Sequence, residues 1–278
     1  MTPRLPSLRG AIAEEVRSLF REEGDDASVY EGEGLFPPGA VIRDVHGDVM
    51  TMMIGGIAGL FLQMLHPLAL AGVWDHSDFR RDMQGRLRRT ARFIATTTYG
   101  NRAQAEAAID QVRRIHGYVT GTLPDGTPYR ADDPRLLGWV HITEAVSFLG
   151  AWMRYREPMM SRARQDAYFA QIAQINARLG AVDLPTDRRG AMTYLNGFRT
   201  ELLVDERTEA AKRALLDYRP ERASLAPMQS LSVQAGIDLL PGWARRMHGL
   251  SVPPLTRPLL RTSAFGLTHT LRWALAAP

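Results

Sequence analysis

The sequence contains no cysteine among its 278 residues. This absence excludes disulfides, iron–sulfur clusters held by the chain, and zinc sites made from thiolates. It also excludes a haem iron that is held by a cysteine sulfur. Chemistry that depends on a thiolate of this chain is therefore ruled out.

Several other signatures are missing as well. The sequence has no internal repeat, no nucleotide-binding glycine loop and no GxSxG nucleophile motif. Its first residues lack the apolar core of a secretory signal, so we expect a cytoplasmic protein. The net charge is only +4 despite an isoelectric point near 9.7, and the arginines are spread over many segments, so we expect no nucleic-acid partner.

Strand signals are scarce, whereas helical periodicity recurs along the chain. With 45% hydrophobic and 23% charged residues, the composition is that of a globular protein. We expect an all-α fold: a single globular helical domain, globin-like in style, that encloses an apolar pocket and occupies residues 41–278. Residues 1–40 are expected to form an amphipathic helix, with Ile12, Val16 and Phe20 on one stripe, followed by a surface loop.

The most apolar segment runs from Val49 to Val73 and is long enough in principle to span a membrane. Gln63, His66 and Pro67 interrupt it, and no second run of comparable apolarity is evident. These features favour a buried central helix that is kinked or ended at Pro67, and no membrane span. Gln63 and His66 either lie near a pocket or are a buried amide and imidazole bonded to the backbone.

Two further helices concentrate cationic, hydroxyl and imidazole side chains. The first is expected to begin near Ser77 and Asp78, and it carries Arg86, Arg89 and Thr90. Arg86 and Thr90 are four residues apart, so they share a face.

The second of these helices covers residues 102–118 and carries Arg113 and His116 three residues apart. Tyr99-Gly100-Asn101 lies between the two helices and predicts a helix stop followed by an N-cap, so we expect an antiparallel hairpin. The polar faces of the two helices would then line one space, which fits an anionic, metal-bearing planar cofactor such as haem. The alternative is that His116 is a core histidine and the arginines face solvent.

The chain then offers a turn at Asp125-Gly126 and a helix of the sequence PRLLGWVHITEAVSFLGAWMRY. His141 and Glu144 are three residues apart on this helix, a spacing that occurs in di-iron sites. No second ExxH motif completes such a site, so His141 is expected to line the cavity or to form a hydrogen bond in the core. Helices are also expected over residues 159–179, 188–205, 209–218, 233–248 and 254–276.

An ordered set of QxxHP, RxxxT, RxxH and WVH elements lies between about Val41 and Arg156. This combination resembles the catalytic domain shared by MpaB-type oxygenases and latex clearing proteins, the rubber oxygenases. The resemblance implies a b-type haem with His116 as its proximal iron ligand. The other side chains that it places in the haem region are Arg86, Thr90, Arg113, Gln63, His66 and His141.

The resemblance also implies an oxygenase that uses O2 on a hydrophobic, alkene-containing substrate of isoprenoid or lipid-like character, with Arg89 and Thr90 as candidate catalytic residues. Rubber-cleaving members carry an acidic residue and a lysine near the distal side. Here HPLALAGV contains no acid, and Arg89 stands where the lysine is expected, so polyisoprene is not the expected substrate. Two alternatives remain: a haem carrier or sensor whose iron is also held by His66, His141 or Arg89, and a metal-free lipid-binding protein.

Overall fold

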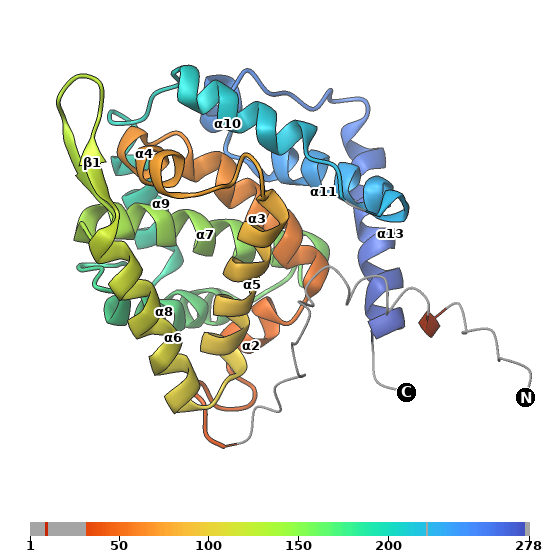
Figure 1. The fold of residues 1–278 in the computed structure, drawn as a ribbon. Coiled ribbons are helices and arrows are strands. Elements are labelled where there is room, and N and C mark those ends of the chain that lie inside the picture. The colour runs from red at the N-terminus through yellow and green to blue at the C-terminus, as the bar shows by residue number, and fades with distance from the viewer. Residues whose placement is uncertain (1–8, 11–31, 221, 276–278) are drawn as a thin grey trace, which may run out of the picture.

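The computed structural model describes residues 9–10, 32–220 and 222–275, and these form the mainly helical body drawn in Figure 1. Its described part contains twelve α-helices and one two-stranded sheet, which confirms the prediction of a single all-α domain. The expected N-terminal amphipathic helix falls mainly on residues outside the described ranges. The elements, in order, are α2 (Val41–His46), α3 (Val49–Gln63), α4 (Pro67–His76), α5 (Met83–Tyr99), α6 (Arg102–Tyr118), β1 (Thr120–Thr122), β2 (Pro128–Arg130), α7 (Pro134–Tyr155), α8 (Arg162–Leu179), α9 (Arg188–Gly197), α10 (Glu206–Asp217), the 3-10 turn η1 (Ala223–Leu225), α11 (Ala226–Leu239), α12 (Gly242–Met247) and α13 (Arg257–Leu275).

The apolar segment of residues 49–73 forms two helices rather than one. α3 ends at Gln63 and α4 begins at Pro67, with an angle of 107° between the two helix axes. Proline suits the first position of α4 because the amide hydrogen that it lacks would have no partner there. The prediction that the helix ends at Pro67 is therefore confirmed, and the break turns α4 away from the core helix.

α5 and α6 are joined at Gly100 and pack side by side (Figure 1). Asn101 accepts a hydrogen bond from the amide of Gln104, whose side chain accepts one from the amide of Asn101, so the bounds of α6 follow the predicted capping. The start of α5 was predicted too early, since Asp82 caps this helix through the amide of Gly85. A short antiparallel hairpin, β1 and β2, follows α6 and turns at Gly126.

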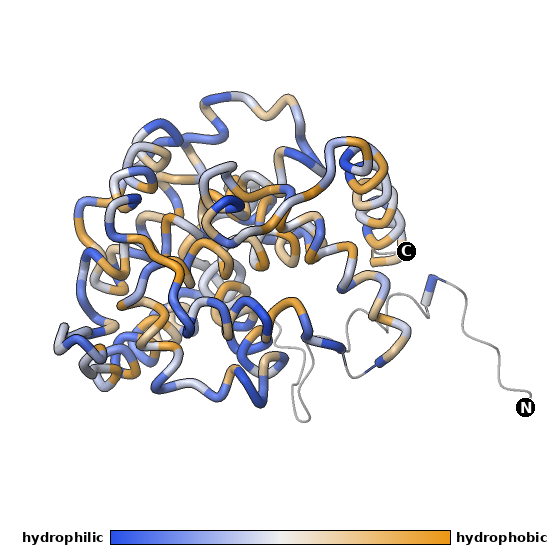
Figure 2. The backbone as a smooth tube through the Cα atoms, turned by 90° about the horizontal axis from the view of Figure 1, so that it is seen from above, coloured by the Kyte–Doolittle hydropathy of each residue, from blue (hydrophilic) through white to orange (hydrophobic). Residues whose placement is uncertain are grey.

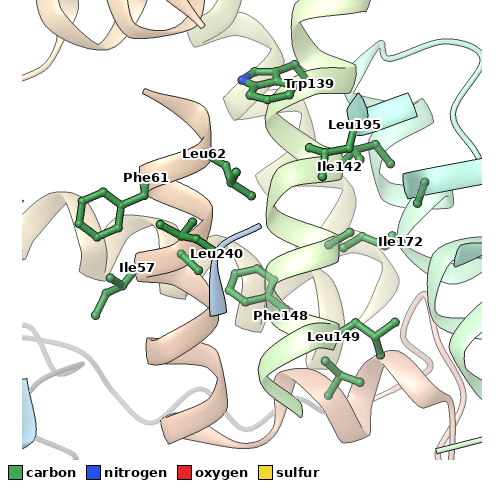
Figure 3. Packing of buried hydrophobic residues seen from close by; sticks show 14 of the residues in the cluster. Ile57, Phe61, Leu62, Trp139, Ile142, Phe148, Leu149, Ile172, Leu195 and Leu240 are labelled. Atoms are coloured by element: carbon green, nitrogen blue, oxygen red, sulfur yellow. The ribbon is translucent and has the colours of Figure 1, made fainter. Parts of the chain in front are cut away.

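α7 lies at the centre of the domain, and its bounds agree with the prediction. Its main partner is α3, and Figure 3 shows Leu62 of α3 on the side that faces Ile142 and Phe148 of α7. By length and composition α7 could also cross a membrane, so the statement that residues 49–73 have no apolar counterpart is wrong. The structure buries 72% of the most apolar window of α7, so core packing accounts for its apolar composition.

The bounds of the C-terminal helices differ from the sequence patterns in both directions, since α10 begins at Glu206 and α11 at Ala226, both earlier than expected. α9 ends at Gly197, and a turn and an extended segment replace the expected helix up to Asp205. Pro241 separates α11 from α12 within what was predicted as one helix. A second apolar cluster is formed by α3, α7, α11 and α13 and includes Met50, Ile54 and Leu271.

Candidate active site

A cavity of about 320 Å³ opens between α3, α4, α5, α6 and α7, a size at the lower end of common ligand pockets. Its wall is mainly apolar, with Leu60, Met64, Val73, Phe79 and Val140 among the lining residues. A small set of polar side chains also lines it: Gln63, His76, Ser77, Arg86, His116 and His141. The arrangement suits a hydrophobic ligand that has a few polar or charged groups.

His116 reaches the cavity from the last turn of α6. Ala105, Ile109 and Val112 bury one stripe of this helix, and His116 continues that stripe toward the C-terminal end. The Nδ1 atom of His116 is buried and has no hydrogen-bond partner. Burial lowers the pKa of His116 while Asp132 partly opposes this shift, so the ring favours the neutral form that can bind a metal.

A second imidazole, that of His141, lines the same cavity from α7. Burial and the neighbouring His116 lower the pKa of His141 to about 3, which keeps the ring neutral. Its Nε2 atom is buried without a partner, and its Nδ1 atom lies 3.9 Å from a carboxylate oxygen of Glu144. This distance is too long for a hydrogen bond, so Glu144 is a neighbour of His141 that does not fix the orientation of its ring.

The carboxyl group of Glu144 has a raised pKa. Burial raises the pKa of its carboxyl to about 7, against the opposing effects of a hydrogen bond from Gln63 and the charge of Arg86. The Nε2 atom of Gln63 donates to this carboxylate over 3.3 Å and to the carbonyl oxygen of Val140 over 3.3 Å. Gln63 therefore connects the cavity wall to a carboxyl group that changes its protonation near neutral pH.

Arg86 joins this polar group from the first part of α5. Its Nη1 atom donates to Ser77 Oγ over 3.1 Å, and burial lowers its pKa. A guanidinium group on a largely apolar wall is suited to an anionic ligand group, because it forms strong charge-assisted hydrogen bonds there.

The structure does not bring Arg89, Thr90 or Arg113 to this cavity. Arg89 is exposed and pairs with Asp82 over 3.4 Å, while Arg113 is exposed and pairs with Asp110 over 3.7 Å. The exposed Thr90 donates to the carbonyl oxygen of Arg86. The expectation that their side chains share one space with His116 is therefore corrected, and their roles stay predictions.

His66 also lies outside the cavity lining. Because α3 ends at Gln63, residue 66 is the N-cap of α4 and does not share a helical face with Gln63. Its ring packs against Trp139 and Phe198, and its Nε2 atom lies 3.9 Å from Glu201. His66 is thus a packed core histidine in this structure, but the expected hydrogen bond from its ring to the backbone is not present, and its buried Nδ1 atom has no partner.

Sequence reasoning gave Glu144 no place among the site residues. The available signal was a single carboxylate in an otherwise apolar helix, three residues after a histidine. Within the described ranges, no group of three or more His, Asp or Glu side chains could hold a metal ion, so the His141–Glu144 pair finds no further protein ligands for a di-iron site there. A haem iron needs only an axial imidazole, because the porphyrin supplies its other nitrogen ligands.

The family comparison matches residues 43–273 to a model described as "ER-bound oxygenase mpaB/B'/Rubber oxygenase, catalytic domain". The chain belongs to this family. The match extends well beyond the residues that carried the resemblance, and it takes in the C-terminal helices as far as α13. Oxygenase chemistry is the activity by which this MpaB and rubber oxygenase family is described. No curated protein and no solved structure matches the chain.

Proposed function

We propose that this MpaB-family chain is a b-type haem-dependent oxygenase that acts on a hydrophobic, alkene-containing substrate of isoprenoid or lipid-like character. The observation that carries the proposal is the half-buried imidazole of His116 on the wall of an apolar cavity, because its Nδ1 atom is buried without a partner and burial lowers the pKa of the ring. The residues present fit the cofactor, since the same cavity also offers Arg86 for a propionate.

In this proposal His116 would hold the iron and Arg86 would hold a propionate group. When bound, haem supplies the redox chemistry with O2, and the protein sets its axial ligand and its surroundings. The apolar side chains would hold the substrate and exclude water from it. Glu144 would accept or release a proton at its carboxyl group, which the Gln63 amide holds by a hydrogen bond, and its pKa of about 7 suits that exchange near neutral pH.

The absorption spectrum of the purified protein tests this proposal. We expect a Soret band that shifts when the reduced protein is exposed to carbon monoxide, and we expect His116→Ala to lose it. Arg113→Ala is the matched control, because Arg113 lies on the same helix but is exposed. An unchanged haem spectrum in His116→Ala would rule out this residue as the ligand. Oxygen consumption with prenylated lipids or terpenoids then tests turnover.

A haem carrier or sensor is the second candidate, and His141 is the observation that favours it. Of the three side chains considered as an additional iron ligand, only His141 lines the cavity, whereas His66 and Arg89 lie elsewhere. A low-spin spectrum that becomes high-spin in His141→Ala, without oxygen consumption, would support the carrier. The proposed partners remain a hydrophobic small molecule and O2, and the proposed compartment remains the cytoplasm.

A further inference from the structure

The C-terminal helix α13 presents an apolar face to solvent at the edge of the molecule (Figure 1). Leu259 is 70% exposed, Phe265 44% and Trp273 53%, and Leu255 just before the helix is 95% exposed. The other exposed positions from Leu259 to Trp273 are Arg261, which pairs with Asp238, and the polar or small residues Thr262, Ser263, Gly266, His269 and Thr270. We call the face made by Leu255, Leu259, Phe265 and Trp273 the α13 outer face.

The opposite side of α13 is also apolar, because Ala264, Leu271 and Ala274 pack into the body of the protein. Figure 2 shows hydrophobic residues recurring along this part of the chain. A helix that is apolar on both sides is expected to be covered on both sides. We therefore expect another molecule or segment to cover the α13 outer face.

The charge around this face identifies the kind of occupant. After Asp238 the sequence contains no Asp or Glu, but it contains five arginines: Arg245, Arg246, Arg257, Arg261 and Arg272. The carboxylate of Asp238 forms ion pairs with Arg154, Arg257 and Arg261, with nitrogen–oxygen distances of 2.9, 3.0 and 2.8 Å. Three guanidinium groups thus share one carboxylate, and two positive charges are left in excess beside Leu255 and Leu259.

We infer that the α13 outer face docks on an anionic lipid bilayer. Exposed leucines and a tryptophan enter the boundary between headgroups and acyl chains, while arginines at the flank of the helix attract anionic headgroups. Trp273 supports this placement, because its half-exposed ring is of the kind that lies at the boundary between headgroups and acyl chains. This inference goes beyond the proposed function and needs no bound haem.

Flotation of the full-length protein with lipid vesicles tests the inference. We expect binding to vesicles of phosphatidylcholine with phosphatidylserine, weaker binding to phosphatidylcholine alone, and release as the salt concentration rises. In Leu255→Ser/Leu259→Ser the partition coefficient should fall by roughly tenfold or more for each inserted leucine. Both side chains are largely exposed, so the double variant should keep the circular dichroism spectrum and the melting temperature of the original chain.

Met159→Ser is the matched control, because Met159 is equally exposed but lies in the turn before α8. This variant should bind vesicles as the original chain does. The fluorescence of Trp273 gives a second readout: vesicles should shift the emission of the original protein to shorter wavelength, and this shift should be absent in Trp273→Phe.

Four outcomes would overturn the inference. The folded protein fails to float with anionic vesicles, or it floats equally well with Leu255→Ser/Leu259→Ser, or it forms a dimer that this double variant abolishes while no lipid binds. The last result would assign the α13 outer face to a second copy of the chain. Protection of residues 8–21 from hydrogen exchange that depends on Leu259, again without lipid binding, would assign it to the N-terminal segment.

Discussion

At the scale of single residues, Glu144 gives the protein a dependence on pH. Burial raises the pKa of this carboxyl group from 4.5 to about 7. Between these pH values the folded chain keeps a proton that the unfolded chain has released, so the contribution of Glu144 to the free energy of unfolding falls as pH rises. The contribution is fully retained below pH 4.5 and is lost as pH passes through 7.

We therefore expect Glu144→Gln to remove this pH dependence. From pH 4.5 to pH 8 the original chain should lose roughly 2 kcal/mol more stability than the variant. This loss is smaller than the full pKa shift would give, because a quarter of the Glu144 side chain is exposed to solvent. Urea unfolding at several pH values measures the difference, with both proteins in the same cofactor state. Glu106→Gln is the control, since Glu106 is on the surface in a weak pair with Arg102. Parallel pH curves for Glu144→Gln and the original chain would contradict the expectation.

Arg86 and Arg113 were predicted as equivalent pocket residues, and the structure separates them. Arg86 lines the cavity, whereas Arg113 forms a surface pair with Asp110. Under the proposed function, Arg86→Gln should weaken haem retention by about tenfold or more, because a charge-assisted hydrogen bond is lost on an apolar wall. Arg113→Gln should retain haem as the original chain does. Transfer of haem to apomyoglobin measures both rates, and equal rates in the two variants would refute the distinction.

At the scale of elements, the contact between α3 and α7 depends on a glycine. A Cβ atom at Gly55 would lie 2.8 Å from Phe148 Cα and 2.9 Å from the carbonyl oxygen of Ser147, so the two helices would have to separate. At the next residue, Gly56, a Cβ atom would meet only Phe148 Cε1 at 3.7 Å. We expect Gly55→Ala to destabilise the fold by about 1–3 kcal/mol.

Gly56→Ala is the matched control and should stabilise the helix by about 0.5–1 kcal/mol, because alanine has the higher helix propensity. Chemical denaturation of both variants measures the difference. If Gly55→Ala were as stable as Gly56→Ala, the close approach of α3 and α7 would be wrong.

The elements also show what the sequence could predict. α6 and α7 have the predicted bounds because Asn101 and Asp133 cap them through local hydrogen bonds. The start of α5 was missed because Ser77, Asp78 and Asp82 are all competent caps, and the local sequence does not choose between them.

The same limit applies to the candidate site. Periodicity placed His116 and Arg86 correctly on the cavity wall, whereas His66 was misplaced because α3 stops between it and Gln63. Helical spacing relates residues only within one unbroken helix. Arg113 shows a second limit. A spacing of three residues places Arg113 and His116 near each other on α6, but it does not decide whether both side chains are covered by a neighbouring helix, and Arg113 is exposed.

At the scale of the whole molecule, Asp238 joins the C-terminal helix to the body. Its side chain is almost fully buried, and it accepts hydrogen bonds from Arg154 on α7 and Arg261 on α13. Arg257 of α13 is its third ion-pair partner. A single carboxylate on α11 thus pairs with guanidinium groups from two other helices, so α13 depends on it for its position.

We expect Asp238→Asn to destabilise the protein by about 3 kcal/mol, since the neutral amide leaves these partly buried guanidinium groups without a counter-charge. The loss should begin at α13, whose amide hydrogens should exchange faster than those of α3 and α7. Asp110→Asn should change stability by no more than about 0.5 kcal/mol, because its pair with Arg113 is on the surface. Hydrogen exchange with mass spectrometry distinguishes the two variants. Uniform acceleration across all helices in Asp238→Asn would instead show that α13 and the core unfold as one unit.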